Sequence, residues 1–250
     1  MVAILLISSE NQLLQRLSAD DRAALGPFER IELTLRQDLE RPNEPIEHVY
    51  FVDTGFASVV ADRSDDDPIE IGLIGNEGMT GVSIVLGDTQ SPFATFVQGN
   101  GIATRISAAN LRQALLHRPG VRKAFGAYVR YFLTQTACTA ASNGRSTIET
   151  RLARWLVMVA DRMGNDFSIT HDFLAIMLAV RRSGVTVALQ QLEGDGLIRS
   201  TRGNILILDR SGLLAVAGDS YGVPEREYRR LFGLDGPPPL ALDGTVLLPA

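Results

Sequence analysis

Residues 169–199 read ITHDFLAIMLAVRRSGVTVALQQLEGDGLIR, and this stretch decides the architecture of the C-terminal half. Its apolar residues follow a helical period twice, with a break between the two runs. Thr170 can cap a first helix that runs through Leu178, and a turn at 179–181 precedes a second helix. Four apolar residues of the second helix share one stripe, at spacings of three, four and seven: Val185, Ala188, Leu189 and Leu192. The pattern predicts a helix–turn–helix.

The segment after the second helix is typical of a two-stranded wing. Residues 196–199 and 205–208 are apolar runs, and the turn-forming residues 201–204 lie between them. A helix–turn–helix with a wing leaves the outer face of its second helix free to enter a DNA major groove.

The residue types on that outer face suit DNA. Arginine can pair bidentately with guanine, a hydroxyl can reach bases or phosphates, and valine can pack on the thymine methyl group. The predicted base contacts are Arg181, Arg182, Ser183, Thr186 and Val187. The predicted phosphate contacts, which position a protein without reading sequence, are Thr170, His171, Gln190 and Arg202. The alternative is an ordinary helical hairpin with a solvated arginine face.

A long helix is predicted upstream of this module. Apolar residues recur there at a 4-3-4-3 spacing, which makes a narrow seam along one helix face. Such a seam suits pairing with a second copy of the chain, so the predicted dimer interface is Val121, Phe125, Tyr128 and Phe132. Packing on the β-domain of the same chain is the alternative. A hinge is expected at 143–146, where Ser146 and Glu149 form a capping box for the next helix.

The N-terminal part changes to a period of two. Alternating apolar residues indicate strands near 31–35, 69–73 and 102–106. Runs at 49–52 and 56–61 are joined by Asp53-Thr54-Gly55, which is typical of a hairpin turn. Short strands with frequent glycines favour an antiparallel sandwich or barrel, preceded by a short helix within 8–26.

These patterns predict an α+β chain with an N-terminal antiparallel β-roll or jelly roll, a long dimerisation helix and a C-terminal winged helix–turn–helix. The predicted domains are 1–118 for the β-roll sensor, 119–145 for the dimerisation helix and hinge, and 146–232 for the DNA-binding domain. The tail 233–250 has no periodicity and is expected to be poorly ordered.

The net charge of −5 conceals an uneven distribution. Residues 1–100 hold 6 basic and 17 acidic side chains, whereas residues 101–250 hold 18 basic and 12 acidic ones. An acidic half joined to a basic half is a hint that the basic half binds a polyanion. Chance combined with an arginine-rich codon usage is the alternative explanation.

The stretch 169–199 resembles the winged helix of the CRP–FNR family of transcription regulators, and the order of elements over 10–230 is similar as well. The resemblance implies a β-roll of the cyclic-nucleotide-binding type and a homodimer that reads a two-fold-related site in double-stranded DNA. It also implies RNA polymerase as a partner if the protein is an activator. Ser183 stands where the family has a glutamate, and Ala179 replaces the turn glycine.

The resemblance also implies an effector pocket, with departures from the cyclic-AMP pattern. The matching positions are Gly81, Val82, Ser83, Ser91 and Thr95. Val82 stands where a glutamate should hold the ribose, and the sequence has no arginine between Arg63 and Arg105. Because a buried cyclic phosphate would lack its charge partner, standard cyclic-AMP binding is not expected. An unknown effector, a non-standard cyclic-nucleotide pocket or no effector at all are the alternatives.

Other classes of function find little support in the sequence. The single Cys138 cannot supply the thiolates of an iron–sulfur cluster, and no metal site or cofactor is predicted. The nucleotide-binding, metalloprotease and hydrolase motifs are absent, so no enzyme is predicted. No apolar stretch reaches the length of a membrane span, and a cytoplasmic location is expected. A ligand-sensing or protein-interaction module that does not read DNA remains as the alternative function.

Overall fold

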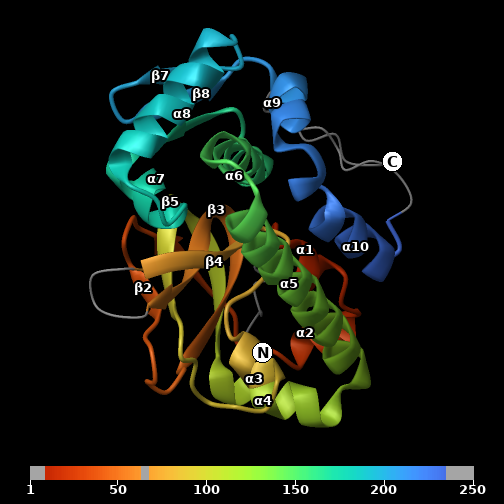
Figure 1. The fold of residues 1–250 in the computed structure, drawn as a ribbon. Coiled ribbons are helices and arrows are strands. Elements are labelled where there is room, and N and C mark those ends of the chain that lie inside the picture. The colour runs from red at the N-terminus through yellow and green to blue at the C-terminus, as the bar shows by residue number, and fades with distance from the viewer. Residues whose placement is uncertain (1–8, 63–67, 235–250) are drawn as a thin grey trace. The chain divides into compact units, whose positions relative to one another are not determined.

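The computed structural model describes residues 9–62 and 68–234 of the 250-residue chain. The chain divides into two compact units, the first comprising Met1–Arg63 and Ile71–Arg130 and the second Ser64–Glu70 and Tyr131–Ala250. The division therefore falls inside the long helix that the sequence analysis treats as a separate segment. The predicted disordered tail lies, from residue 235 onward, outside the described residues. The α+β class is confirmed (Figure 1).

The first unit is built on an antiparallel sheet. Strand β5 pairs antiparallel with β1, β2 and β3, and β4 lies beyond β3 in the order β1-β5-β3-β4. The strands are β1 (Glu29–Leu33), β2 (Asp38–Glu40), β3 (His48–Asp62), β4 (Pro68–Ile74), whose residues 68–70 are counted with the second unit, and β5 (Ala94–Ser107). The helices are α1 (Gln12–Gln15), α2 (Ala19–Ala23), α3 (Val82–Val85) and α4 (Ala108–His117).

The hairpin predicted at Asp53-Thr54-Gly55 is wrong, because these residues lie within the single continuous strand β3. The register against β5 shifts at this point, as in a β-bulge, and Gly55 has a φ of 81°. Asp53 is buried, and its carboxylate accepts hydrogen bonds from the Ser9 and Thr104 hydroxyls at 2.5 and 2.9 Å. Buried partners for the aspartate therefore allow a turn-forming triplet to remain inside a strand.

Helix α5 (Pro119–Arg145) confirms the long helix, but its predicted dimer seam lies inside the chain. Val121, Phe125 and Tyr128 are fully buried in the first unit, and Phe132 is buried in the second. The Phe125 ring lies 5.6 Å from that of Phe51, and Tyr128 packs so closely on Gly78 that a Cβ there would come within 2.5 Å of the phenol oxygen. Val121, Phe125 and Tyr128 are therefore not exposed to a second copy, and for these three the alternative of packing on the β-domain of the same chain is correct.

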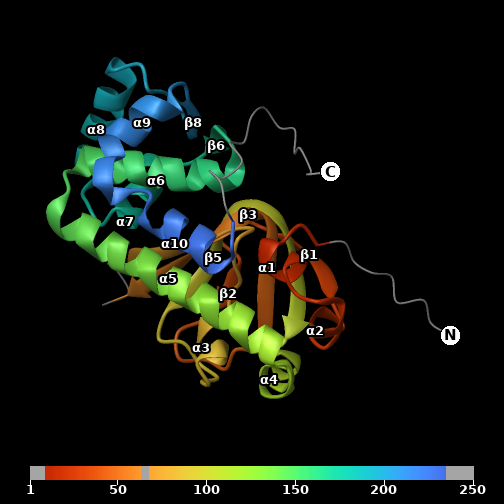
Figure 2. The same ribbon diagram turned by 90° about the vertical axis from the view of Figure 1, so that its right-hand side faces the viewer.

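The second unit gathers around α6 (Ile148–Met163), against which α8 (Arg182–Gly194) and α9 (Arg210–Ala217) pack (Figure 2). Nine consecutive residues of α6, 152–160, are buried. The remaining elements are β6 (Asp166–Ser168), α7 (His171–Met177), β7 (Ile198–Thr201), β8 (Asn204–Ile207) and α10 (Val223–Leu231). The wing predicted with two strands has three, in the order β6-β8-β7, because residues 166–168 pair with β8.

The N-terminus of α6 differs by one residue from the predicted capping box. Thr147 is the N-cap, and its hydroxyl oxygen accepts a hydrogen bond from the backbone N–H of Thr150 at 3.2 Å. Ser146 instead donates its backbone N–H to the Ser142 carbonyl and so continues the turn of α5. Two adjacent hydroxyl residues can both cap a helix, and the sequence pattern could not distinguish between them.

Candidate nucleic-acid interface

Helices α7 and α8 form the predicted helix–turn–helix. Val185, Ala188, Leu189 and Leu192 are all buried, so the inner stripe of α8 is confirmed. The hydroxyl oxygen of Thr170 accepts the backbone N–H of Phe173 at 3.2 Å and caps α7, as predicted. This local hydrogen bond and the apolar stripe explain why the sequence folds into the motif.

The turn between the two helices is held by two specific features. Ala179 adopts a left-handed backbone with a φ of 48° where a glycine would be unstrained. The guanidinium of Arg151, on α6, donates a hydrogen bond to the Leu178 carbonyl, which ends α7. Burial lowers the pKa of Arg151, because it disfavours the charged form of the guanidinium. Sequence analysis missed Arg151, because its partner is a backbone atom 27 residues away.

The predicted base-contacting residues lie together at the start of α8. Arg181, Arg182 and Ser183 are exposed, and Val187 is 63% exposed although it is apolar. Thr186 is half-buried; its hydroxyl donates to the Arg182 carbonyl at 3.1 Å and lies 3.3 Å from Nδ1 of His171. Arginines and hydroxyls can form hydrogen bonds with base edges in the major groove, and an exposed valine can pack on a thymine methyl group.

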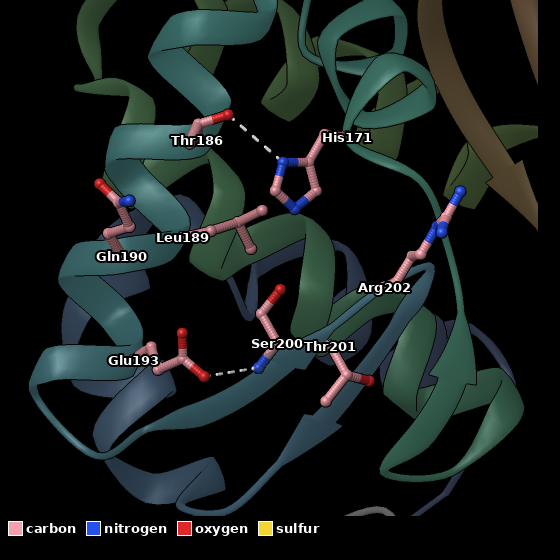
Figure 3. A pocket seen from close by; sticks show the side chains of 8 residues that line it. All are labelled: His171, Thr186, Leu189, Gln190, Glu193, Ser200, Thr201 and Arg202. Carbon is pink, nitrogen blue, oxygen red and sulfur yellow. Dashed lines mark hydrogen bonds between the residues drawn. The ribbon is translucent and has the colours of Figure 1, made fainter.

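Three of the predicted phosphate-contacting residues line one hollow between α8 and the wing (Figure 3). This hollow measures about 280 Å³, and its lining residues are His171, Thr186, Leu189, Gln190, Glu193, Ser200, Thr201 and Arg202. Figure 3 shows the His171 ring pointing into the space between α8 and β7. Thr170, the fourth predicted phosphate contact, does not line the hollow and uses its hydroxyl oxygen as the α7 cap.

Glu193, Ser200 and Thr201 were missed by sequence reasoning. The Glu193 carboxylate accepts the backbone N–H of Ser200 at 2.9 Å and so links the end of α8 to the wing (Figure 3). A usable signal existed for Glu193, which lies three residues after Gln190 and so shares its helix face. No comparable signal existed for the wing residues.

A second hollow, of about 360 Å³, lies on the other side of α8. Its lining residues are Ile148, Glu149, Ser183, Gly184, Val187, Ala188 and Gln191. A Cβ on Gly184 would come within 2.9 Å of the Cδ1 atom of Ile148. The glycine therefore lets the start of α8 approach α6 closely, which sets the position of the arginine-bearing end.

This module has recognisable relatives. Residues 150–216 match the family model described as the Crp-like helix-turn-helix domain. The chain carries a Crp-like helix-turn-helix domain. The match begins within α6 and ends within α9, so it contains both hollows apart from Ile148 and Glu149. The resemblance to the CRP–FNR regulators is thereby confirmed over residues 150–216.

Solved structures share the fold over most of the chain. A protein described as a transcriptional regulator of the CRP/FNR family from Eubacterium rectale is 17% identical, with a TM-score of 0.66 over 82% of this chain and 97% of that one. FixK2 from Bradyrhizobium japonicum is 18% identical, with a TM-score of 0.67 over 77% and 98% of the two chains. The c-di-GMP responsive regulator CLP of Xanthomonas campestris is 19% identical, with a TM-score of 0.63 over 76% and 99%.

These matches are to transcription regulators and not to enzymes. A comparison with curated protein sequences found no match. In residues 9–62 and 68–234, no three or more histidine, cysteine, aspartate or glutamate side chains are grouped so that they could hold a metal ion. Within the same ranges no helix combines the length and the apolar character that a membrane crossing requires.

The predicted effector-pocket residues of the first unit are brought together only in part. Gly81, with a φ of 78°, and Thr95 both contact Glu40, a β2 residue that sequence analysis missed. Ser91 is buried and its hydroxyl oxygen accepts the Phe93 backbone N–H at 3.1 Å, while Val82 and Ser83 begin α3. Burial raises the pKa of Glu40, and hydrogen bonds from Gly81, Thr95 and Thr80 oppose that rise.

Proposed function

We propose that this chain is a homodimeric, cytoplasmic transcription regulator that inserts α8 into the major groove of double-stranded DNA at a two-fold-related site. The observation that carries the proposal is the exposed arginine-bearing start of α8 beside a hollow that is shared with the wing. The start of α8 can reach base edges, whereas His171, Gln190 and Arg202 around the hollow are suited to contact phosphate oxygens.

Charge alone is a weak part of this proposal. Residues 144–210 contain 9 arginines and 7 acidic residues, which is a small excess for a DNA-binding domain. Recognition must therefore depend on where individual arginines lie, and Arg181, Arg182 and Arg202 lie on the proposed DNA-facing surface. Such a distribution favours sequence-specific contacts over a general attraction to the phosphate backbone.

The dimer that we propose uses the exposed face of α5 instead of the buried seam. Exposed residues on this helix also recur at heptad-like spacings of four and three: Gly126, Arg130, Leu133, Ala137, Ala140 and Gly144. Leu133 is 57% exposed, and its small neighbours would let a second helix approach closely. A homodimer of this kind would read two half-sites about 34–36 Å apart.

The test is a selection of bound duplexes with the full chain, followed by two charge-removing variants. Arg182→Ala should relax base preference at one position in each half-site, whereas Arg202→Ala should weaken all duplexes about equally. Binding should also fall steeply with salt, with a log–log slope of about 0.9 per phosphate contacted. If both variants bind the selected duplex like the unmodified protein, the docking geometry is wrong.

The second candidate is a module that senses a ligand or a protein and does not read DNA. It predicts no duplex-dependent mobility shift at low salt, and so the same selection separates the two functions.

For the proposed regulator we assign no particular effector, and the β-roll either senses an unknown one or senses none. RNA polymerase is a partner only if the protein activates transcription. Cyclic AMP and c-di-GMP are both phosphate anions, and the Glu40 carboxylate beside Gly81 disfavours either near that amide. Calorimetry with each nucleotide tests this.

A further inference from the structure

Arg182 has an acidic neighbour on the other helix of the motif. Its Nε atom lies 3.0 Å from Oδ1 of Asp172, which belongs to the first turn of α7. Both side chains are well exposed, at 67% and 68%. Exposed ion pairs contribute little to folding, about 0–1 kcal/mol, so the stability of the unit gives no strong reason for this pair.

We propose that Asp172 is a positioning residue that holds the Arg182 guanidinium in the orientation in which it reads a base. The inference rests on the proposed function and adds to it a specificity-determining residue that makes no base contact of its own. An unrestrained arginine has many rotamers, and fixing them costs free energy when DNA binds. A carboxylate that already orients the side chain reduces that cost.

The atoms involved in the ion pair suit this role. The Asp172 carboxylate lies on the Nε side of the Arg182 guanidinium, and the two terminal nitrogens lie at the far end of the planar group. A guanine presents two acceptors, N7 and O6, to a pair of parallel donors in the major groove. The arginine can therefore keep its contact with Asp172 and still pair bidentately with a guanine.

Asp172 cannot serve to attract DNA in general. A carboxylate close to DNA phosphates repels them, so Asp172 by itself lowers the affinity for any duplex. An acidic residue in the first turn of α7 also stabilises that helix to a small extent. The two roles predict different results: a helix-stabilising role concerns only folding, whereas a positioning role concerns base preference at the one position that Arg182 reads.

The experiment compares selected-site profiles of the full chain and its variants at one salt concentration. Arg182→Ala identifies the position read by this arginine, where discrimination should fall by about 5- to 150-fold. Asp172→Ala should relax the same position by about 2- to 5-fold, the effect of one exposed ion pair. Its affinity for an unrelated duplex should stay unchanged or rise. Asp172→Asn keeps an acceptor for Nε–H and should retain part of the discrimination.

Two controls separate the positioning role from other effects. Asp195→Asn removes another exposed carboxylate, at the end of α8, but leaves Arg182 untouched, so it should leave base preference unchanged. In an Arg182→Ala background, Asp172→Ala should cause no further loss of discrimination. Unfolding followed by tryptophan fluorescence should show both Asp172 variants folded.

Each failure has its own meaning. If the unmodified chain selects no duplex, the proposed function is wrong. If the chain selects a site and Arg182→Ala relaxes one position, but Asp172→Ala leaves that position as selective as before, the positioning role is wrong and the function stands. Relaxation at other positions, or equally in the Arg182→Ala background, also overturns the role.

Discussion

The backbone N–H of Gly81 donates to Oε1 of Glu40 across 2.5 Å, joining two residues that are 41 positions apart. The other carboxylate oxygen of Glu40 accepts the Thr95 hydroxyl at 3.1 Å. The half-buried Glu40 carboxylate thus accepts hydrogen bonds from two of the residues that were predicted to line the effector pocket, Gly81 and Thr95.

The first prediction concerns the pH dependence of this carboxyl group. Burial raises its folded-state pKa above 4.5, so between 4.5 and the raised value the native state binds more protons than the unfolded state. The free energy of unfolding should therefore fall as pH rises through that window. Glu40→Gln should flatten this part of the profile, measured by urea unfolding with circular dichroism. Glu44→Gln, at a well-exposed carboxylate, is the control, and coinciding Glu40→Gln and unmodified profiles would contradict the assignment.

The second prediction concerns the strained turn of the helix–turn–helix. Ala179 pays for its left-handed backbone, and Ala179→Gly removes that strain but increases the entropy of the unfolded chain. The balance should stabilise the second unit by about 0.5–1 kcal/mol. The single tryptophan of the chain, Trp155, lies in α6 and reports on this unit by fluorescence. Ala175→Gly, inside α7, should instead destabilise by about 1 kcal/mol; equal effects of the two changes would be inconsistent with a strained turn.

The third prediction concerns the arginine that supports the same turn. Arg151→Met deletes the donor to the Leu178 carbonyl and leaves that acceptor in a half-buried place, which should cost about 1–3 kcal/mol of stability. The matched control is Arg199→Met in the wing, where an exposed arginine should change stability by less than about 0.5 kcal/mol. Tryptophan fluorescence in urea measures both, and similar small effects would argue against the role of Arg151.

The fourth prediction separates the two faces of α5. Leu133→Glu places a charge on the exposed face and should convert the dimer to a monomer with little loss of stability, as measured by sedimentation velocity. Phe125→Ala leaves a cavity in the first unit and should cost about 3–5 kcal/mol. Leu116→Glu, at an even more exposed position on α4, is the control. A Leu133→Glu protein that stays dimeric would show that another surface pairs the chains.

Local features of the fold were predictable from the sequence. The inner stripe of α8, the Thr170 cap and the two wing strands on either side of residues 202–203 all depend on neighbours within a few residues. Features that depend on residues distant in the sequence were not predictable. Asp53-Thr54-Gly55 has the composition of a turn, yet Ser9 and Thr104 keep it inside β3.

The candidate site shows the same limit. Spacing placed His171, Gln190 and Arg202 among the DNA-facing residues, and the tertiary structure brings them around one hollow. The contact of Arg182 with Asp172 could not be predicted, because it depends on how two helices cross. Neither could the hydrogen bond from Arg151 to the turn.

By itself, therefore, the sequence determined a helix–turn–helix with a wing, an antiparallel β-domain and a long helix between them, because period and capping are recorded in adjacent residues. Only the tertiary structure decided that the apolar seam of α5 faces its own chain, that Glu40 meets Gly81 and that Asp172 meets Arg182. The physical reason is that periodicity records which face of an element is buried or charged, whereas the surface that it meets is set by packing between residues far apart in the chain.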